Sequence, residues 1–357
     1  MTLRDAVVLS TWSWSTFNVP ERIALSLASR GIRVLYCEIP VSYFRRAGEP
    51  LREVATGTYR FGPQYLGAKL SSLPVVGRFQ WQMVARQIIS RARALKLKEP
   101  MFLYSHIERM TPLCEEMREA GFPLIHICMD YPEPYQYELI ELSDQTLVIP
   151  KSVFHELRAK YGKKIHCIPQ SIHLATAMKQ GNGCLKEPLP LARVPRPRLG
   201  YLGPIFARLN LSMLHEFLAQ NPNWHFVYFG QSNALQHPNA HAMPWRSPEE
   251  LPEFVASFDV GMMPYDCSDK KNLHCSPLKL YDYFLEGLPV VSTPILAVSE
   301  FKDLIYSGAT VRELSDAVGR ALDEPSDSPK RSFRMQVARE HSTEAQGQRL
   351  EEVLKLL

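Results

Sequence analysis

Short apolar runs alternate with amphipathic stretches along the first half of the chain. A run of four to six apolar residues is typical of a strand buried on both faces of a parallel sheet. Between the first two runs, residues 20–30 place apolar side chains at helical spacing, with a proline in the first turn and Gly31 after the last. This order predicts a βαβ unit with a right-handed crossover. The expected strands of this half are 6–10, 33–38, 101–104, 124–128, 146–149 and 164–168.

The same alternation restarts after a proline-rich break at residues 177–198, where we predict a linker. At roughly 150 residues per domain, a chain of 357 residues predicts about two domains. We expect these to be residues 1–176 and 199–330, each a doubly wound α/β sheet, with a C-terminal helix at 331–357 that packs back toward the first domain. The expected strands of the second domain are 199–202, 225–229, 260–263 and 289–292.

The composition excludes several classes of protein. A hydrophobic fraction of 45% and a charged fraction of 22% are ordinary globular values, which exclude a disordered or coiled-coil chain. We find no apolar run of the roughly 18 residues that a membrane-spanning helix needs, and no basic-then-apolar signal peptide. The seven cysteines are scattered without a CxxC pair, so neither a zinc site nor a disulfide framework is expected. We therefore expect a reduced, cytoplasmic protein.

The net charge of +4 is distributed unevenly along the chain. Residues 33–98 hold 12 Lys and Arg against 3 Asp and Glu, a local charge of +9. A solvated basic face would explain this, and so would a surface that docks on anionic lipid or on an anionic acceptor. Tyr43, Phe44 and Tyr65 lie among the basic residues and favour a peripheral contact with the cytoplasmic face of the inner membrane. No nucleic-acid motif accompanies the charge, so no nucleic acid is expected as a partner.

The segment 259–293 has the pattern with the most chemical content. A predicted strand and a polar loop lead to a helix, for which we expect Ser276 as the N-cap and Pro277 as the first helical residue. The backbone N–H groups of Leu278 and Lys279 would then point out of the helix start, where free donors and the helix dipole bind phosphate.

Two charged side chains extend this interpretation. Lys279 adds a cation in the first helical turn, and we expect it to be exposed. Asp282 lies three residues further along the same helix face, where its carboxylate could accept hydrogen bonds from ribose hydroxyls. The residue types thus fit a site for a nucleotide diphosphate. An ordinary capped helix with a Lys–Asp surface pair would give the same pattern.

Together these motifs resemble the donor-binding signature of GT-B glycosyltransferases, and most of all the group 1, family 4-like bacterial enzymes that build surface polysaccharides. The matching stretches are 264–265, 276–283 and 287–292, with further likeness at 200–205 followed by Arg208, at 226–230 and at 251–265. The likeness is strong in 199–293 and diffuse before residue 150. It implies two Rossmann-like doubly wound domains that face a central cleft, a nucleotide-sugar donor and transfer without a metal.

The resemblance also implies roles at matching positions. Lys279 and Arg208 correspond to the basic pair that neutralises the diphosphate, which lets the nucleoside diphosphate leave without a metal. Gly203 corresponds to a close approach of the backbone to the donor, and Asp282 to a ribose-binding glutamate. Trp245 falls in the expected base-contacting loop. A surface arginine, a tight turn and a packing tryptophan are the ordinary alternatives for Arg208, Gly203 and Trp245.

One position departs from the family pattern. Retaining members often carry a second glutamate eight residues before the ribose carboxylate, and this chain has His274 there. The imidazole could hydrogen-bond the sugar or the phosphate, or it could be an exposed loop residue. The substitution leaves open whether transfer retains or inverts the anomeric configuration.

The first domain is expected to supply the acceptor site and a general base. His106 follows the strand 101–104 and Asp130 follows the strand 124–128, so both lie at strand carboxyl ends, where open parallel sheets bind ligands. We predict Asp130 as the base and His106 as a contact to the acceptor or donor sugar, although each could be a capping or loop residue. The aromatic and hydroxyl-rich stretch 11–17 is expected to border the acceptor.

The sequence thus predicts a hexosyltransferase-type enzyme of polysaccharide or glycoconjugate biosynthesis. The donor would be a nucleotide-diphosphate sugar, with a UDP-sugar favoured, and the acceptor a saccharide or lipid-linked saccharide. No cofactor or metal is expected. Two alternatives stay open: a catalytically degenerate sugar-nucleotide-binding partner protein, which His274 would favour, and a sugar-nucleotide epimerase with the same fold, whose extra carboxylates are not obvious in this sequence.

Overall fold

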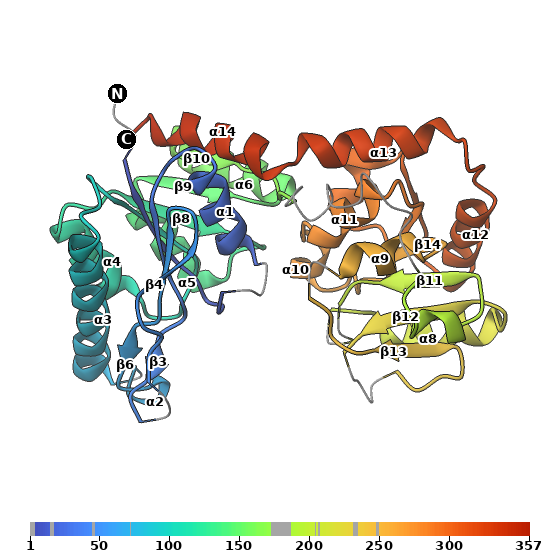
Figure 1. The fold of residues 1–357 in the computed structure, drawn as a ribbon, viewed down its shortest axis with the longest axis horizontal. Helices are drawn as coiled ribbons and strands as arrows, with labels where there is room; N and C mark the ends of the chain where they lie inside the picture. Colours follow the sequence, from blue (N-terminus) through green and yellow to red (C-terminus); the bar gives the residue numbers. More distant parts are fainter. Residues whose placement is uncertain are drawn as a thin grey trace. The chain divides into compact units, whose positions relative to one another are not determined.

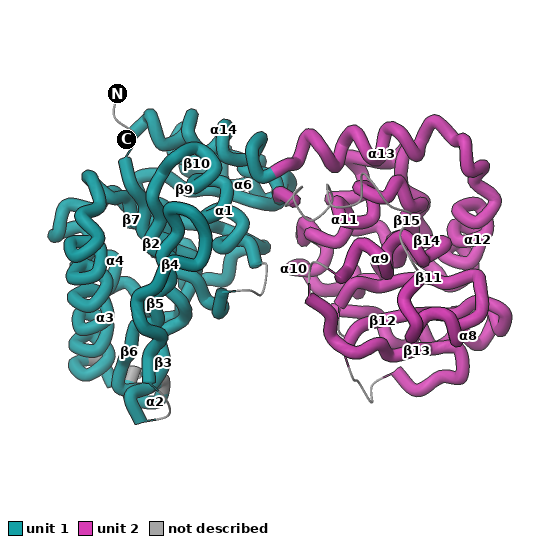
Figure 2. Tube along the Cα trace, viewed as in Figure 1, with its two compact units in different colours: residues 1–170, 343–357 teal, residues 171–342 magenta. Residues whose placement is uncertain are grey.

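The computed structural model describes two compact units (Figure 2). The first comprises residues 1–170 and 343–357, and the second residues 171–342. Within the described residues, no helix is long and apolar enough to cross a membrane. The described residues are 4–14, 18–44, 47–71, 73–172, 187–203, 205, 208–230, 235–247 and 250–357.

An eight-stranded sheet forms the centre of the first unit (Figure 1). Neighbouring strands are parallel, except that β4 runs antiparallel to β5. In sheet order the strands are β10 (Ile165–Cys167), β9 (Gln145–Val148), β8 (Leu124–Cys128), β7 (Met101–Tyr104), β1 (Ala6–Leu9), β2 (Val34–Cys37), β5 (Thr58–Phe61) and β4 (Arg52–Ala55). All residues of β1, β2, β7 and β8 are buried, which explains why these strands are almost entirely apolar, with the buried His126 on β8 as the exception. The six strands expected in this half are all present.

Helices cover this sheet, and a small second sheet lies beside it. The helices are α1 (Val19–Ala28), α2 (Ala68–Ser71), α3 (Pro74–Ala94), α4 (Thr111–Glu119), α5 (Pro134–Leu142), α6 (Lys151–Tyr161), the 3-10 turn η1 (Gly162–Lys164) and α14 (Thr343–Leu354). The small sheet pairs β3 (Val41–Ser42) with β6 (Gln64–Tyr65). The sequence pattern predicted neither this sheet nor the strands β4 and β5, because these strands are short and partly exposed.

The second unit is built on six parallel strands. In sheet order they are β13 (Ala240–Met243), β12 (His225–Phe229), β11 (Arg198–Tyr201), β14 (Val260–Met263), β15 (Val290–Ser292) and β16 (Ile305–Ser307). Its helices are η2 (Leu191–Arg193), α8 (Leu211–Gln220), α9 (Leu251–Ala256), α10 (Lys270–Leu273), α11 (Leu278–Leu285), η3 (Leu296–Phe301), α12 (Val311–Leu322) and α13 (Pro329–Glu340). The four expected strands are present, and the two edge strands β13 and β16 add to them. The doubly wound α/β architecture expected of each half is therefore confirmed.

The two C-terminal helices belong to different units. Helix α13 packs on α11 in the second unit, whereas α14 packs on α1 in the first (Figure 1). Ser26 Oγ on α1 donates to Gln346 Oε1 on α14 at 2.8 Å. The unit boundary therefore lies near residue 342, inside the segment that we expected at 331–357. Of the expected linker, residues 177–186 lie outside the described residues, and residues 187–198 belong to the second unit.

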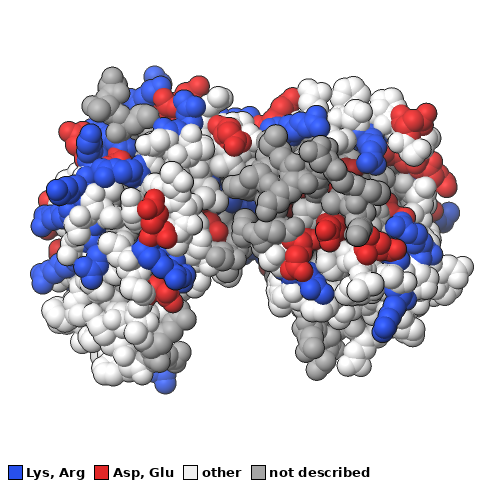
Figure 3. Space-filling model, viewed as in Figure 1, with Lys and Arg blue, Asp and Glu red and all other residues white. Residues whose placement is uncertain are grey.

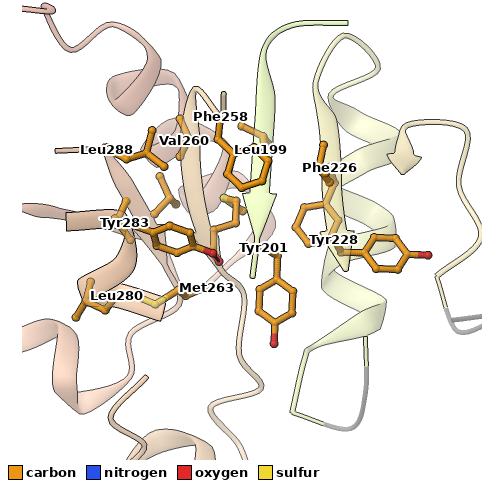
Figure 4. Packing of buried hydrophobic residues seen from close by; sticks show 14 of the residues in the cluster. Leu199, Tyr201, Phe226, Tyr228, Phe258, Val260, Met263, Leu280, Tyr283 and Leu288 are labelled. Carbon is orange, nitrogen blue, oxygen red and sulfur yellow. Dashed lines mark hydrogen bonds between the residues drawn. The ribbon is translucent and has the colours of Figure 1, made fainter. Parts of the chain in front are cut away.

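The core of the second unit is rich in aromatic rings from β11, β12 and α11 (Figure 4). Tyr283 on α11 is fully buried, and its hydroxyl donates to Gly200 O at 3.0 Å and accepts from Leu202 N at 2.9 Å. A Cβ atom at Gly261 on β14 would lie 2.7 Å from the Tyr283 ring, so only glycine lets α11 approach this strand so closely. These contacts fix the end of β11 relative to helix α11.

Candidate functional site

The sheet of the second unit has a topological switch point between β11 and β14. From β11 the chain continues through α8 to β12 on one side, and from β14 it continues through α10 and α11 to β15 on the other. In open α/β sheets, ligands bind outside the carboxyl ends of the strands at such a point. A ligand would therefore be expected to bind at the segments that follow these two strands, within 202–210 and 264–277.

Backbone contacts hold these two segments together. Asp266 N donates to Arg208 O at 2.9 Å, and the buried Asn272 side chain donates to the same oxygen at 3.2 Å. Leu209 forms an antiparallel bridge with Tyr265. The half-buried Arg208 is thus anchored beside the loop that leads to α11.

Lys279 lies between two tyrosines. Its Nζ donates to Tyr265 Oη at 2.9 Å, and it lies 4.6 Å from the centroid of the Tyr201 ring and 5.3 Å from that of Tyr265. Both tyrosines are buried, and Figure 4 shows the Tyr201 hydroxyl pointing beyond the end of its strand. Lys279 itself is half-buried, so the expectation that it is exposed is wrong. Its ring contacts are at distances typical of cation–π attraction.

The surroundings of Lys279 change its acidity. Burial lowers the pKa of Lys279 to about 8; Cys275 opposes this effect, Arg208 adds to it by charge repulsion, and Asp282 opposes it. At pH 7 the amine is therefore still mostly protonated. A cation that has lost part of its hydration gains more from a bound anion than an exposed lysine would.

Helix α11 begins one residue later than expected. Pro277 has φ −71° and ψ 124°, an extended conformation, and occupies the N-cap, so Leu278 is the first helical residue. No side-chain oxygen caps the helix, and the assignment of Ser276 as the N-cap is wrong. The reason is that the proline ring fixes φ but leaves ψ free, and an extended ψ places Pro277 before the helix. The N–H groups of Leu278 and Lys279 still belong to the first helical turn, where helices leave backbone donors unpaired.

Two other predicted residues flank this helix start. Gly203 has φ +151°, a conformation that favours glycine, and a Cβ there would lie 3.3 Å from the Tyr201 ring. Asp282 is half-buried one turn along α11, and its charge acts on Lys279. The structure thus brings Gly203, Arg208, Lys279 and Asp282 into one region of the second unit. Their roles toward a ligand stay predictions.

His274 and Trp245 lie in different surroundings. His274 is half-buried at the C-terminal end of the short helix α10, where its backbone N–H donates to Lys270 O at 3.1 Å, and it directly precedes Cys275. Trp245 follows the edge strand β13, two strands away from β11, and is 67% exposed. Among the described residues, no ring or hydrogen-bond contact joins Trp245 to the region around Lys279.

In the first unit, His106 and Asp130 follow the adjacent parallel strands β7 and β8. The strand order places a switch point between β1 and β7, so His106 lies at the position where that sheet would bind a ligand. Its ring lies 6.3 Å from that of Tyr135, and both His106 and Asp130 are half-buried. Trp12, which follows β1, is 53% exposed; residues 15–17 of the expected acceptor stretch lie outside the described residues.

The sequence interpretation missed the part played by tyrosines. The sequence places Tyr265 only in a motif and Tyr201 only in a strand, whereas in the structure both contact the Lys279 amine. The available signal was their position at the ends of two strands that are neighbours at the switch point: Tyr201 is the last residue of β11, and Tyr265 lies two residues after β14. Tyrosines at or just beyond the carboxyl ends of two adjacent strands can meet a lysine from the following helix.

Comparisons with known proteins bear on the fold and the chemistry. No family model matches the chain. Sucrose-phosphate synthase from Thermosynechococcus elongatus has a TM-score of 0.71 at 13% identity, covering 99% of both chains. The α,α-trehalose 6-phosphate synthase of Burkholderia multivorans has a TM-score of 0.65 at 12% identity, again over 99% of both chains. The chain has the GT-B fold. At these identities the likeness shows the fold alone, and it confirms the resemblance drawn from the motifs at that level.

A sequence relative adds a chemical indication. A Bacillus subtilis (strain 168) protein, provisionally described as the teichuronic acid biosynthesis glycosyltransferase TuaH, is 29% identical over 154 residues. The match covers 40% of this GT-B chain and 38% of that protein. Because less than half of either chain is matched, the activity of the relative supports a proposal for this one.

Proposed function

We propose that this protein transfers a sugar from a nucleotide-diphosphate sugar, with a UDP-sugar favoured, to a saccharide or lipid-linked saccharide during polysaccharide or glycoconjugate synthesis. The observation that carries the proposal is Lys279, a half-buried ammonium in the first turn of α11 at a sheet switch point. A diphosphate is the ligand that best matches a cation, a helix N-terminus and a nearby arginine. The described role of the Bacillus relative supports the same class of reaction.

The proposed chemistry follows from the charges. The bond between the anomeric carbon and the diphosphate oxygen breaks, and its electron pair stays on the leaving nucleoside diphosphate. The acceptor hydroxyl forms the new bond to the anomeric carbon and loses its proton to a base. Lys279 and Arg208 would stabilise the charge that develops on the leaving group, which is how the reaction could proceed without a metal. Asp130 is the proposed base, and His106 the proposed contact to sugar or acceptor.

A thermal-shift screen against UDP, GDP, ADP and TDP and their common sugar derivatives, with and without EDTA, tests the donor half of the proposal. A ligand that binds only the folded state raises the melting temperature by mass action. We expect one base to give a selective shift that survives EDTA. Lys302, an exposed lysine of the same unit, provides a matched control: Lys302→Met should keep the shift, and Lys279→Met should lower it. No shift with any nucleotide at millimolar concentration would contradict the proposal.

One observation favours a second candidate. By the resemblance, His274 stands where retaining family members often carry a glutamate. The absence of that glutamate would fit a protein that binds a sugar nucleotide without turning it over. Release of nucleoside diphosphate distinguishes the two. Nucleotide binding with no release in the presence of saccharide and lipid-linked acceptors would favour the binding protein over the enzyme.

A further inference from the structure

Five large exposed apolar side chains gather at one end of the first unit. Among the described residues, twelve large apolar side chains are exposed, and five of them lie on β3, α2, α3 and the turns that join these elements. These five, which we name the apolar tip, are Tyr43, Phe44, Leu73, Val75 and Phe79. Phe44 is 81% exposed and Val75 82%, which leaves almost all of their apolar surface in water. Exposed apolar side chains on neighbouring elements are typical of an interaction site.

Hydrogen bonds and a ring contact join the elements that carry the apolar tip. The β3–β6 pair is extended by Tyr43 N donating to Tyr65 O at 3.0 Å. The Tyr65 ring lies 6.1 Å from that of Trp81, a buried residue of α3. Gly67 N, after β6, donates to Gln80 Oε1 on α3 at 3.3 Å. The small sheet is thus fastened to the first turns of α3, and Figure 1 shows β3, β6, α2 and one end of α3 together.

Helix α3 extends from the apolar tip and adds positive charge to the same side of the unit. It spans 21 residues with four arginines and no acidic residue. Positions three or four apart share a helix face, and its outward stripe runs from apolar to basic. That stripe is Val75, Phe79, Gln82, Arg86, Ser90 and Arg93, which we name the α3 stripe. The opposite face is buried in the core through Trp81, Val84, Ala85, Ile88 and Ala92.

The charges of the α3 stripe are available to a partner. Arg86 and Arg93 are exposed and have no ion-pair partner among the described residues. On the neighbouring helix α4, Glu115 pairs with Arg78 at 3.1 Å, and Glu116 accepts from Gln82 at 2.6 Å. These two acidic groups of α4 are therefore engaged. Figure 3 shows Lys and Arg along the side of the first unit that carries α3, above a lower end with little charge.

We propose that the apolar tip and the α3 stripe bind the surface of an anionic lipid bilayer. Aromatic and aliphatic side chains would enter the boundary between headgroups and acyl chains, and the arginines would meet anionic headgroups. This arrangement is that of a surface that lies on a membrane without spanning it. Membrane binding would place the protein where a lipid-linked saccharide acceptor is held. This link to the acceptor rests on the proposed function.

Charge favours a bilayer over a second copy of the chain. In a twofold dimer the same patch meets itself, so the basic stripe of one copy would face the basic stripe of the other. Like charges across an interface oppose association, whereas anionic lipids attract them. The apolar tip next to an unpaired basic stripe therefore fits lipid better than self-association.

Co-sedimentation with vesicles tests the proposal. The protein is mixed with phosphatidylcholine vesicles and with vesicles that also contain about 30% phosphatidylglycerol, which supplies the anionic headgroups. We expect binding to the anionic vesicles, weakened by raising the salt concentration. The tip variant Phe44→Ser/Val75→Ser/Phe79→Ser and the stripe variant Arg86→Gln/Arg93→Gln should each lower the partition coefficient more than tenfold.

Two controls make the result specific. Leu189 and Phe333 are exposed apolar residues of the second unit, at 85% and 56%, and Leu189→Ser/Phe333→Ser should bind vesicles like the wild type. Every variant should keep the wild-type nucleotide-induced thermal shift, so failure of vesicle binding and failure of the proposed function give different results. Equal binding to both vesicle types, absence of binding, or vesicle binding unchanged in the tip variant would overturn the proposal. So would a concentration-dependent dimer that only the tip variant abolishes.

Discussion

Replacing Lys279 by methionine separates two consequences of a half-buried ammonium: its effect on the stability of the unliganded protein and its effect on the affinity for UDP. Burial lowers the pKa of Lys279 from 10.5 to about 8. At about 1.4 kcal/mol per pKa unit, this is roughly 3 kcal/mol by which the site favours the neutral amine. The unfolded chain binds this proton more tightly, so the free energy of unfolding should rise with pH between about 8 and 10.5 and stay at its lower value below 8. At pH 7, the charged lysine therefore lowers the stability of the unliganded protein.

Methionine keeps the length of the side chain and removes the charge. The gain of roughly 3 kcal/mol is offset by the lost hydrogen bond to Tyr265 and the lost contact with the Tyr201 ring, each worth about 1 kcal/mol. We expect Lys279→Met to stabilise the unliganded second unit by about 1 kcal/mol, a rise of roughly 2–4 °C in its melting temperature. We expect the same change to weaken UDP binding by more than tenfold, because a charge-assisted hydrogen bond contributes about 1.5–3 kcal/mol.

Calorimetric titration and thermal melts across pH provide the assay. If binding needs the ammonium, the Kd of wild-type protein for UDP should rise about tenfold from pH 7 to pH 9, since the charged fraction of a group with pKa about 8 falls by that factor. Lys279→Met should show no such step, and the exposed-lysine control Lys302→Met should behave like the wild type. An unchanged Kd in Lys279→Met, or a wild-type Kd that is flat between pH 7 and 9, would refute the reasoning.

Three further predictions concern neighbouring groups. Tyr265→Phe removes the hydroxyl that accepts from Lys279 and keeps the ring, so UDP affinity should fall about fivefold by calorimetry with little change in stability, as expected for one hydrogen bond of about 1 kcal/mol; wild-type affinity would argue against a positioning role for Tyr265. Asp130→Asn should lower the rate of sugar transfer at least a hundredfold in a nucleotide-release assay while leaving the Kd for donor unchanged, the contribution of roughly 10² expected of a general base; equal losses in Kd and rate would count against that role. Arg334→Met leaves Glu324 buried without its bidentate partner at 2.6 and 2.7 Å, and should destabilise the second unit by about 3–5 kcal/mol in denaturant melts; a loss below 1 kcal/mol would show that the pair is dispensable.

The strands that position the site were predictable because each is buried on both faces. The runs at β1, β7 and β14 are continuously apolar, and β8 is interrupted only by His126; a parallel sheet covered by helices favours that pattern. The elements that the pattern missed are the short or partly exposed ones, such as β3, β6 and β13, where few buried positions leave no period to detect.

The site itself was predictable in part. Lys279 and Arg208 could be named from their motif positions, but their shared environment comes from residues far apart in sequence. Tyr201 and Tyr265 approach the same amine because β11 and β14 are neighbours in the sheet, which no local pattern records. These tyrosines cause the half-burial of Lys279. Because the local sequence around the helix start does not reveal them, the sequence alone predicts an exposed lysine.

The most direct test of the account is a crystal structure of the protein with UDP. The account predicts the diphosphate at the start of α11, with phosphate oxygens within hydrogen-bond distance of Lys279 Nζ and of the N–H groups of Leu278 and Lys279. Nucleotide bound at any other place in the second unit, with Lys279 still hydrogen-bonded to Tyr265 and no phosphate beside it, would contradict the assignment of this site.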